Sequence, residues 1–224
     1  MKKIPIILIL LIVLFGIKPS FAKAEEQPQN CKWSIINKNG TILVQQFYTS
    51  GQKLTDPFTI LAESNIPEQQ TCLVNFEKAG VEGHIVGWFQ NGNKRFESDY
   101  KNGKRHGKVI NWYKSGQKES EGNYINGNRQ GSLIFWYENG QKSNEGNYVN
   151  DQLEGIRTTW YKDGQKMSET KYVDGATEMT YWYKNGQKEI EVKIVDGKLR
   201  TTTCTEEGVL KEVHLDKILL DKIL

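Results

Sequence analysis

The residues that could carry acid–base, nucleophilic or metal chemistry in this chain are few and scattered. Its 224 residues include three histidines and three cysteines. They are His84, His106, His214, Cys31, Cys72 and Cys204. No histidine lies at a metal-ligand or triad spacing from a cysteine, serine or aspartate, and the sequence has no GxSxG, HExxH or phosphate-loop motif. The pattern therefore predicts no catalytic residue, no metal site and no cofactor.

One series of carboxylates does recur at a regular spacing. Glu121, Glu145, Glu169 and Glu191 lie 24, 24 and 22 residues apart. A glycosidase needs two carboxyl groups at a defined separation, so a secreted hydrolase is one interpretation of this series. A glutamate that recurs in every repeat beside lysine is more typical of a surface charge ladder, and we expect the protein not to be an enzyme.

The N-terminus has the layout of a secretory signal peptide. Basic residues 1–3 precede an apolar run at 4–17, which is shorter than the roughly 20 residues of a membrane-spanning helix. Small residues then offer cleavage after Ala22 or Ala24. We expect residues 1–22 to be a signal peptide and the protein to be secreted or periplasmic. The alternative is an uncleaved N-terminal membrane anchor.

Removal of that segment changes the charge balance. The chain has 30 Lys and Arg against 27 Asp and Glu, and residues 1–22 hold Lys2, Lys3 and Lys18. The remainder is close to neutral, so we expect no nucleic-acid partner, which would require a clustered positive surface.

A repeat organises most of the chain. Segments such as WYKSGQKESEGNYING begin at Trp88, Trp112, Trp136, Trp160 and Trp182, with spacings of 24, 24, 24 and 22 residues. Self-similarity at this period indicates a repeat architecture. We place tandem repeats at 76–208, a degenerate N-terminal region at 25–75 with an insertion at 55–70, and a C-terminal cap at 209–224. Cys204 occupies the next tryptophan position.

Each repeat has the pattern of antiparallel strands joined by tight turns. Asn-Gly and Asp-Gly pairs favour type I′ hairpin turns, and aromatic and β-branched residues fill the segments between them. Two nine-residue strands and two such turns make 22 residues. The 24-residue repeats carry an additional Gly107, Gly131 or Gly155, where we expect a wider turn or a bulge. The fold class predicted is all-β, an extended antiparallel meander.

The turns also predict a register. Around Asp174-Gly175, Lys171 should face Glu178 and Thr170 should face Met179. Around Asn185-Gly186, Trp182 should face Glu189 and Tyr181 should face Ile190. One face then collects tyrosine, isoleucine and valine, and the other collects tryptophan with a Lys171–Glu178–Lys193 charge ladder.

So extended a sheet cannot bury both faces with this many residues. It must curl, twist or form a homodimer over its apolar face. The amphipathic stretch 215–224 is expected to form a short helix or a last strand.

The same linear arrangement constrains the cysteines. An exported protein meets an oxidising compartment, and an odd count allows at most one internal bridge. Sequential repeats hold Cys204 too far from the other two for a disulfide. The candidate pair is therefore Cys31 and Cys72.

Two aromatic ladders are the candidate binding residues. They comprise Trp88, Trp112, Trp136, Trp160 and Trp182, together with Tyr113, Tyr137, Tyr161 and Tyr183. One interpretation is structural: the aromatics cover Gly122 and Gly146 and pack across strands. The other is a platform that stacks on cell-envelope glycan or lipid headgroups.

The motif resembles the variant MORN repeat of bacterial proteins called YwqK-family antitoxins. The residues that carry the resemblance are Trp112, Tyr113, Gly116, Gln117, Lys118, Glu121, Gly122, Tyr124, Asn126, Gly127 and Gly131, and it extends over about 76–208. It implies a β-meander with an interaction role, and the antitoxin name implies a toxin partner. We therefore expect an exported, non-enzymatic scaffold with an unknown protein partner. The alternative is glycan or lipid-headgroup binding.

Overall fold

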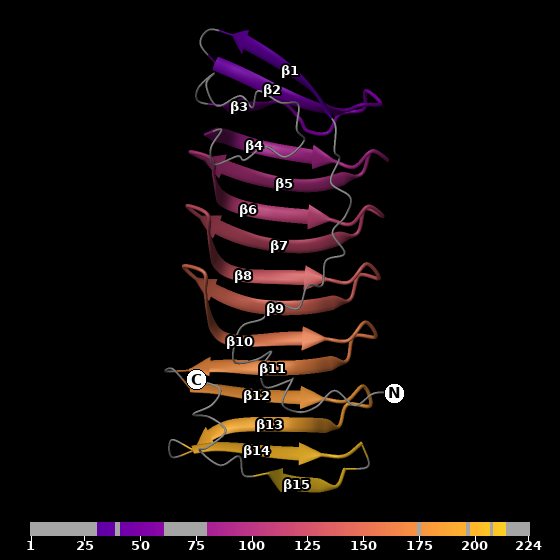
Figure 1. Cartoon of the computed structure of the whole chain (residues 1–224), viewed down its shortest axis with the longest axis vertical. Coiled ribbons are helices and arrows are strands. Elements are labelled where there is room, and N and C mark those ends of the chain that lie inside the picture. Colours follow the sequence, from indigo (N-terminus) through magenta and orange to yellow (C-terminus); the bar gives the residue numbers. More distant parts are fainter. Residues whose placement is uncertain are drawn as a thin grey trace.

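The computed structural model describes residues 31–38, 41–60, 80–173, 176–195, 198–206 and 208–213. These residues form one antiparallel sheet of 15 strands whose spatial order is the sequence order (Figure 1). The strands are β1 Cys31–Lys38, β2 Thr41–Tyr48, β3 Phe58–Ile60, β4 Val81–Trp88, β5 Lys94–Lys101, β6 Lys104–Trp112, β7 Lys118–Ile125, β8 Asn128–Trp136, β9 Lys142–Val149, β10 Gln152–Trp160, β11 Lys166–Val173, β12 Ala176–Trp182, β13 Lys188–Val195, β14 Lys198–Cys204 and β15 Leu210–Val213.

The all-β meander predicted from the repeat is confirmed. Every described strand pairs with its sequence neighbours, and the described ranges hold no helix. No part of them forms a helix able to span a bilayer. The proposed signal peptide and the stretch 215–224 lie outside the described residues, whereas Leu210–Val213 forms a strand. Part of the predicted insertion, Phe58–Ile60, forms β3.

Two kinds of turn alternate, one kind at each end of the strands (Figure 1). Two-residue turns with positive φ at both centres occur at Asn102-Gly103, Asn126-Gly127 and Asn150-Asp151. This is the type I′ geometry expected of a tight hairpin. The left-handed conformation at Asp151 shows that glycine is not obligatory at the second centre, since its φ is 69°.

The loops at the opposite end of the strands are longer than the sequence predicted. Tyr183 donates its backbone N–H to the Gln187 carbonyl at 2.9 Å, and Gly186 donates to the Tyr183 carbonyl at 2.9 Å. The connection is therefore a five-residue loop, 183–187, whose fourth residue Gly186 has a positive φ, and not a two-residue turn at Asn185-Gly186. The pairing of Tyr181 with Ile190 is confirmed, but Trp182 faces Lys188 in place of Glu189. The expected pairs of Lys171 with Glu178 and Thr170 with Met179 are confirmed.

The additional glycines of the longer repeats lie in bulges, as predicted. Gly107, Gly131 and Gly155 all have positive φ. Between β9 and β10, Glu154 pairs with Asn147 and Thr158 pairs with Glu145, so three residues face one. The bulge accommodates the two residues by which a 24-residue repeat exceeds a 22-residue one.

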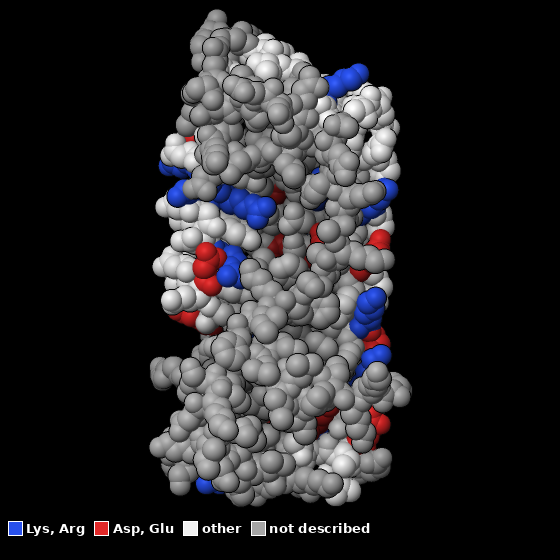
Figure 2. Space-filling view, viewed as in Figure 1, with Lys and Arg blue, Asp and Glu red and all other residues white. Residues whose placement is uncertain are grey.

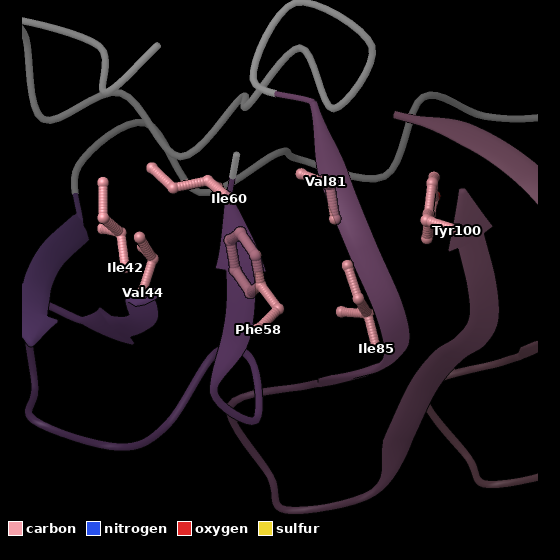
Figure 3. Close-up of a cluster of buried hydrophobic side chains, with 7 residues drawn as sticks. All are labelled: Ile42, Val44, Phe58, Ile60, Val81, Ile85 and Tyr100. Carbon is pink, nitrogen blue, oxygen red and sulfur yellow. The ribbon is translucent and has the colours of Figure 1, made fainter. Parts of the chain in front are cut away.

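A cluster of buried apolar side chains lies at the N-terminal end of the described sheet. It is built from β2 to β5, and Figure 3 shows its side chains converging beside β3 and β4. Its members are Ile42, Val44, Phe58, Ile60, Val81, Ile85 and Tyr100, with Phe96 packed against it. Farther along the sheet, apolar side chains such as Leu133 in β8 and Ile190 in β13 are also buried, but they are not part of this cluster.

Cys31, at the start of β1, is disulfide-bonded, and Cys204 at the end of β14 is free. Cys72 lies outside the described residues, so the Cys31–Cys72 pairing stays a prediction.

Candidate functional site

A bulge beside each wide loop brings a lysine and a glutamate onto one face. Asn111 pairs with Ser120, whereas Trp112 pairs with Lys118, so Glu119 is an extra residue. In a regular strand, residues three apart point to opposite faces. The extra residue reverses that alternation, and Lys118 meets Glu121. The same contact recurs in five repeats, at 2.5–2.9 Å, for Lys94–Glu97, Lys118–Glu121, Lys142–Glu145, Lys166–Glu169 and Lys188–Glu191.

Each of these lysines except the last also lies over the tryptophan of the next repeat. The Lys118 ammonium is 5.3 Å from the centre of the Trp136 ring, and Lys53 is 4.0 Å from that of Trp88. The other pairs are Lys94 with Trp112, Lys142 with Trp160 and Lys166 with Trp182, at 5.2–5.8 Å. These are cation–π distances. The predicted tryptophan ladder therefore exists, and the chain's own lysines lie over its rings.

The predicted tyrosine ladder ties adjacent repeats together. The Tyr137 hydroxyl donates to the Trp160 carbonyl at 2.7 Å, and burial raises the pKa of that hydroxyl, so it stays protonated and able to donate. Equivalent bonds of 2.7–3.0 Å join Tyr48 to Trp88, Tyr113 to Trp136, Tyr161 to Trp182 and Tyr183 to Cys204. Cys204 thus takes the place of a tryptophan, as the repeat spacing predicted.

The tyrosine series has one interruption. Phe89 occupies the tyrosine position in the loop between β4 and β5, and its backbone bonds to Asn93 and Gly92 repeat those of the other loops. A phenyl ring has no hydroxyl to donate to the Trp112 carbonyl. The Asn91 amide donates to the Lys114 carbonyl at 2.8 Å, as Asn139 does to the Lys162 carbonyl in a loop that keeps its tyrosine, and Asn93 donates to the same Lys114 carbonyl at 3.0 Å.

Removing one tyrosine hydroxyl is expected to destabilise the sheet by about 1 kcal/mol. Tyr137→Phe should show this loss in chemical denaturation because the Trp160 carbonyl loses its donor. Phe89→Tyr is the reciprocal variant, expected to stabilise by up to about 1 kcal/mol. Equal midpoints for wild type and Tyr137→Phe would mean that the hydroxyl adds nothing to the sheet.

The opposite face carries a series of arginine and tyrosine side chains. The Arg129 guanidinium lies 4.3 Å from the Tyr148 ring centre, and Arg105 lies 5.5 Å from that of Tyr124. Arg129 also donates to the Asp151 carboxylate, at 2.7 Å. The type I′ turn at Asn150-Asp151 is thereby joined to β8.

A shallow hollow lies on the tryptophan-bearing face between β8 and β10. It has a volume of about 250 Å³ and is lined by Ser132, Glu145, Gly146, Asn147, Ile156 and Thr158. Ser132 lies directly across from Asn147, and Thr158 lies directly across from Glu145. The lining combines one carboxylate, two hydroxyls, an amide and an isoleucine that is 51% exposed.

Among the described residues, those with catalytic potential lie apart from one another. His84 contacts Asp99, with Nδ1 2.8 Å from Oδ1, on an exposed part of the sheet. Within the described ranges, no three His, Cys, Asp or Glu side chains could hold a metal ion. Basic and acidic residues lie beside one another along the described parts of the face in Figure 2.

Two details of the sequence interpretation are corrected. Leucines lie closest to the glycines that aromatics were expected to cover: Leu133 Cδ1 would be 2.6 Å from a Cβ at Gly122, and Leu153 Cδ1 would be 2.7 Å from one at Gly146, where Tyr148 Cε2 also lies at 3.5 Å. The charge ladder through Glu178 is also wrong. Lys171 and Lys193 contact Glu169 and Glu191 on their own strands, at 3.9 and 3.3 Å.

The structure also reveals features that the sequence interpretation missed, namely the interruption at Phe89 and the hollow beside Glu145. Each feature follows from a single residue that differs from the residue at the equivalent position of another repeat. Phe89 stands in the tyrosine column, and Ser132 stands where Lys108 stands one repeat earlier.

Comparison with known proteins bears on the repeats. Among solved structures, a match entitled "Crystal structure of GtfA/B complex bound to UDP and GlcNAc" has 12% identity and a TM-score of 0.22. It covers 53% of this chain and 25% of that chain. No curated protein matches. Residues 105–126, 129–150 and 153–174 match the family model described as the MORN repeat variant. The segments that begin at β6, β8 and β10 are therefore three tandem MORN-variant repeats.

Proposed function

We propose that this protein is an exported, non-enzymatic scaffold that binds a protein partner along its extended sheet. Repeats of the MORN type are generally protein- or membrane-binding and non-catalytic. The observation that carries the proposal is the repeated tryptophan-bearing face, on which the same Lys–Glu contact recurs in five repeats. Export rests on the signal-peptide pattern of residues 1–22.

A protein partner fits this face better than an acidic membrane or a glycan. The lysines that follow the wide loops each contact a glutamate, so the face alternates in charge and offers no uniform positive field to anionic lipid. Lysines from the preceding repeat lie over the tryptophan rings that a sugar would need for stacking. The tyrosine hydroxyls are engaged with main-chain carbonyls.

Specificity would come from the positions that vary between repeats. Position 108 is lysine, and the equivalent positions 132 and 156 are serine and isoleucine. Ile156 and Ile125 are exposed hydrophobic side chains. Each repeat thus presents the same backbone and the same Lys–Glu contact, with a different side chain at the variable position. Such a surface suits an extended protein interface. Because the repeats resemble those of YwqK-family antitoxins, a toxin protein is the partner class to test first.

The test is cross-linking of the tagged protein in its own cell, followed by mass spectrometry of captured envelope proteins. The proposal expects one saturable partner, recovered with wild type and reduced with Ile156→Asp. Lys162→Ala is the matched control, because Lys162 lies at the end of the strands, in the loop between β10 and β11. Localisation in the cytoplasm, or capture of no saturable partner, would overturn the proposal. Sedimentation of the purified protein separates a heterologous partner from a homodimer.

A further inference from the structure

The surroundings of the repeated glutamate differ from one repeat to the next. Two positions flank it: one on the preceding strand, occupied by Lys108, Ser132 or Ile156, and one two residues after it. The second position holds Asn123, Asn147, Lys171 or Lys193. A lysine at either position can bring a second ammonium group to the carboxylate, in addition to the lysine three residues before it.

Three repeats supply that second ammonium themselves. Glu121 Oε1 lies 2.7 Å from the Lys108 ammonium, and Oε2 contacts Lys118. Hydrogen bonds from these two lysines lower the pKa of Glu121. Lys171 lies 3.9 Å from Glu169, and Lys193 lies 3.3 Å from Glu191. In the first repeat, beside Glu97, the flanking residues His84 and Asp99 contact each other.

Glu145 differs from Glu121, Glu169 and Glu191 because neither flanking position holds a lysine, and it differs from Glu97 because its flanking residues carry no charge. Ser132 and Asn147 occupy the flanking positions, and they face each other across β8 and β9. Glu145 keeps the contact with Lys142, at 2.6 Å, and its side chain is 36% exposed. The hollow of about 250 Å³ opens at this place, and Ser132, Glu145 and Asn147 line it.

We propose that this hollow binds a lysine side chain of the partner protein, whose ammonium group contacts Glu145. The aliphatic stem would lie against Ile156, and the three ammonium protons would be accepted by the carboxylate and by the Ser132, Thr158 or Asn147 oxygens. The chain provides the template, because Lys108 makes this contact with Glu121 one repeat earlier. The inference rests on the proposed function only in assigning the lysine to a protein.

The test is an NMR titration of ¹⁵N-labelled protein with Nα-acetyl-lysine methylamide at low ionic strength, followed at the Gly146 and Asn147 amides. Ser132→Lys should place the chain's own ammonium on Glu145, as Lys108 does on Glu121, and abolish the shifts. Glu145→Gln keeps the shape and should weaken binding about fivefold, the upper end for an exposed ion pair. Glu121→Gln is the matched control, whose carboxylate is already occupied, and it should bind like wild type.

Saturable shifts that are confined to the hollow, lost in Ser132→Lys and kept in Glu121→Gln would support the inference. Absent shifts in wild type, or shifts that survive both Ser132→Lys and Glu145→Gln, would overturn it. Equal affinity for Nα-acetyl-arginine methylamide would overturn the choice of a primary ammonium. The result is independent of partner capture, since the hollow can bind free lysine analogue even where no scaffold partner is recovered.

Discussion

Phe58→Ala is expected to destabilise the N-terminal end of the sheet by about 3–5 kcal/mol and to leave its far end unchanged. Phe58 is 2% exposed and belongs to the cluster formed by β2 to β5. Each strand pairs only with its sequence neighbours. In such a repeat architecture the stability is close to a sum of local terms and nearest-neighbour contacts, so a cavity at one end is felt mainly there.

Site-resolved hydrogen exchange measures this effect. Amides of β2 to β5 should exchange faster in Phe58→Ala, whereas those of β9 to β11 should keep their wild-type protection. Leu133→Ala, in β8, is the matched variant and should accelerate exchange in the middle of the sheet. If both variants accelerated all strands equally, the sheet would unfold as one unit and the nearest-neighbour description would be wrong.

Gly87→Ala is expected to cost about 1–3 kcal/mol, the usual range for overpacking. A Cβ at Gly87 would lie 2.1 Å from Cε1 and 2.5 Å from Cδ1 of Phe96, which pairs with Gly87 across β4 and β5. The Phe96 ring packs against the apolar cluster, so its displacement disturbs packing there. Thermal unfolding of the purified variant gives the cost.

A double variant tests the mechanism. Replacing Phe96 by alanine removes the ring that a Cβ at position 87 would meet. Gly87→Ala should therefore cost clearly less in the Phe96→Ala background than in wild type, and the difference is the coupling between the two positions. Equal costs in both backgrounds would show that the ring does not limit what position 87 can hold. Gly131→Ala is no substitute control, because its φ of 77° adds backbone strain.

Much of the fold follows from the sequence because its turn residues recur at a regular spacing. The Trp-to-Trp spacing and the Asn-Gly pairs gave the strand order, the type I′ turns at Asn102 and Asn126, and the pairs around residues 174–175. The bulges at Gly107, Gly131 and Gly155 followed from the two extra residues of the longer repeats. Each of these features is fixed by local chemistry within one hairpin.

The wide loops could not be separated from the tight turns by dipeptide alone. Asn126-Gly127 and Asn185-Gly186 are the same dipeptide, yet the first is a two-residue turn and the second lies inside a five-residue loop. The tyrosine hydroxyl is not the cause, because the loop at Phe89 makes the same backbone hydrogen bonds without one. The wide loop is followed by a bulge, in which Trp182 pairs with Lys188 and Glu189 is an extra residue, and the dipeptide alone does not reveal that extra residue.

The candidate site was less accessible from the sequence for a related reason. The aligned repeats show that tryptophan and tyrosine recur at equivalent positions. They do not show which side chain lies over a tryptophan ring or which group accepts the hydrogen bond of a tyrosine hydroxyl. The bulge at Glu119 puts Lys118 and Glu121 on one face, which strict alternation forbids. The hollow beside Glu145 depends on Ser132, which stands where Lys108 stands one repeat earlier, whereas Asn147 matches Asn123 of that repeat.

The most direct test of the central claim, that the repeats form an open ladder in sequence order, is a set of spin-label distances between equivalent loops. Labels would be placed in pairs at Lys114 and Lys162, Lys114 and Lys184, and Gln90 and Lys184, with Cys204→Ser to remove the free thiol. At about 4.8 Å per strand, separations of four, six and eight strands predict distances of roughly 19, 29 and 38 Å. A steady increase with strand number is the predicted result. A distance for the eight-strand pair that equals or falls below that for the four-strand pair would mean that the sheet closes or folds back on itself, and would contradict the account.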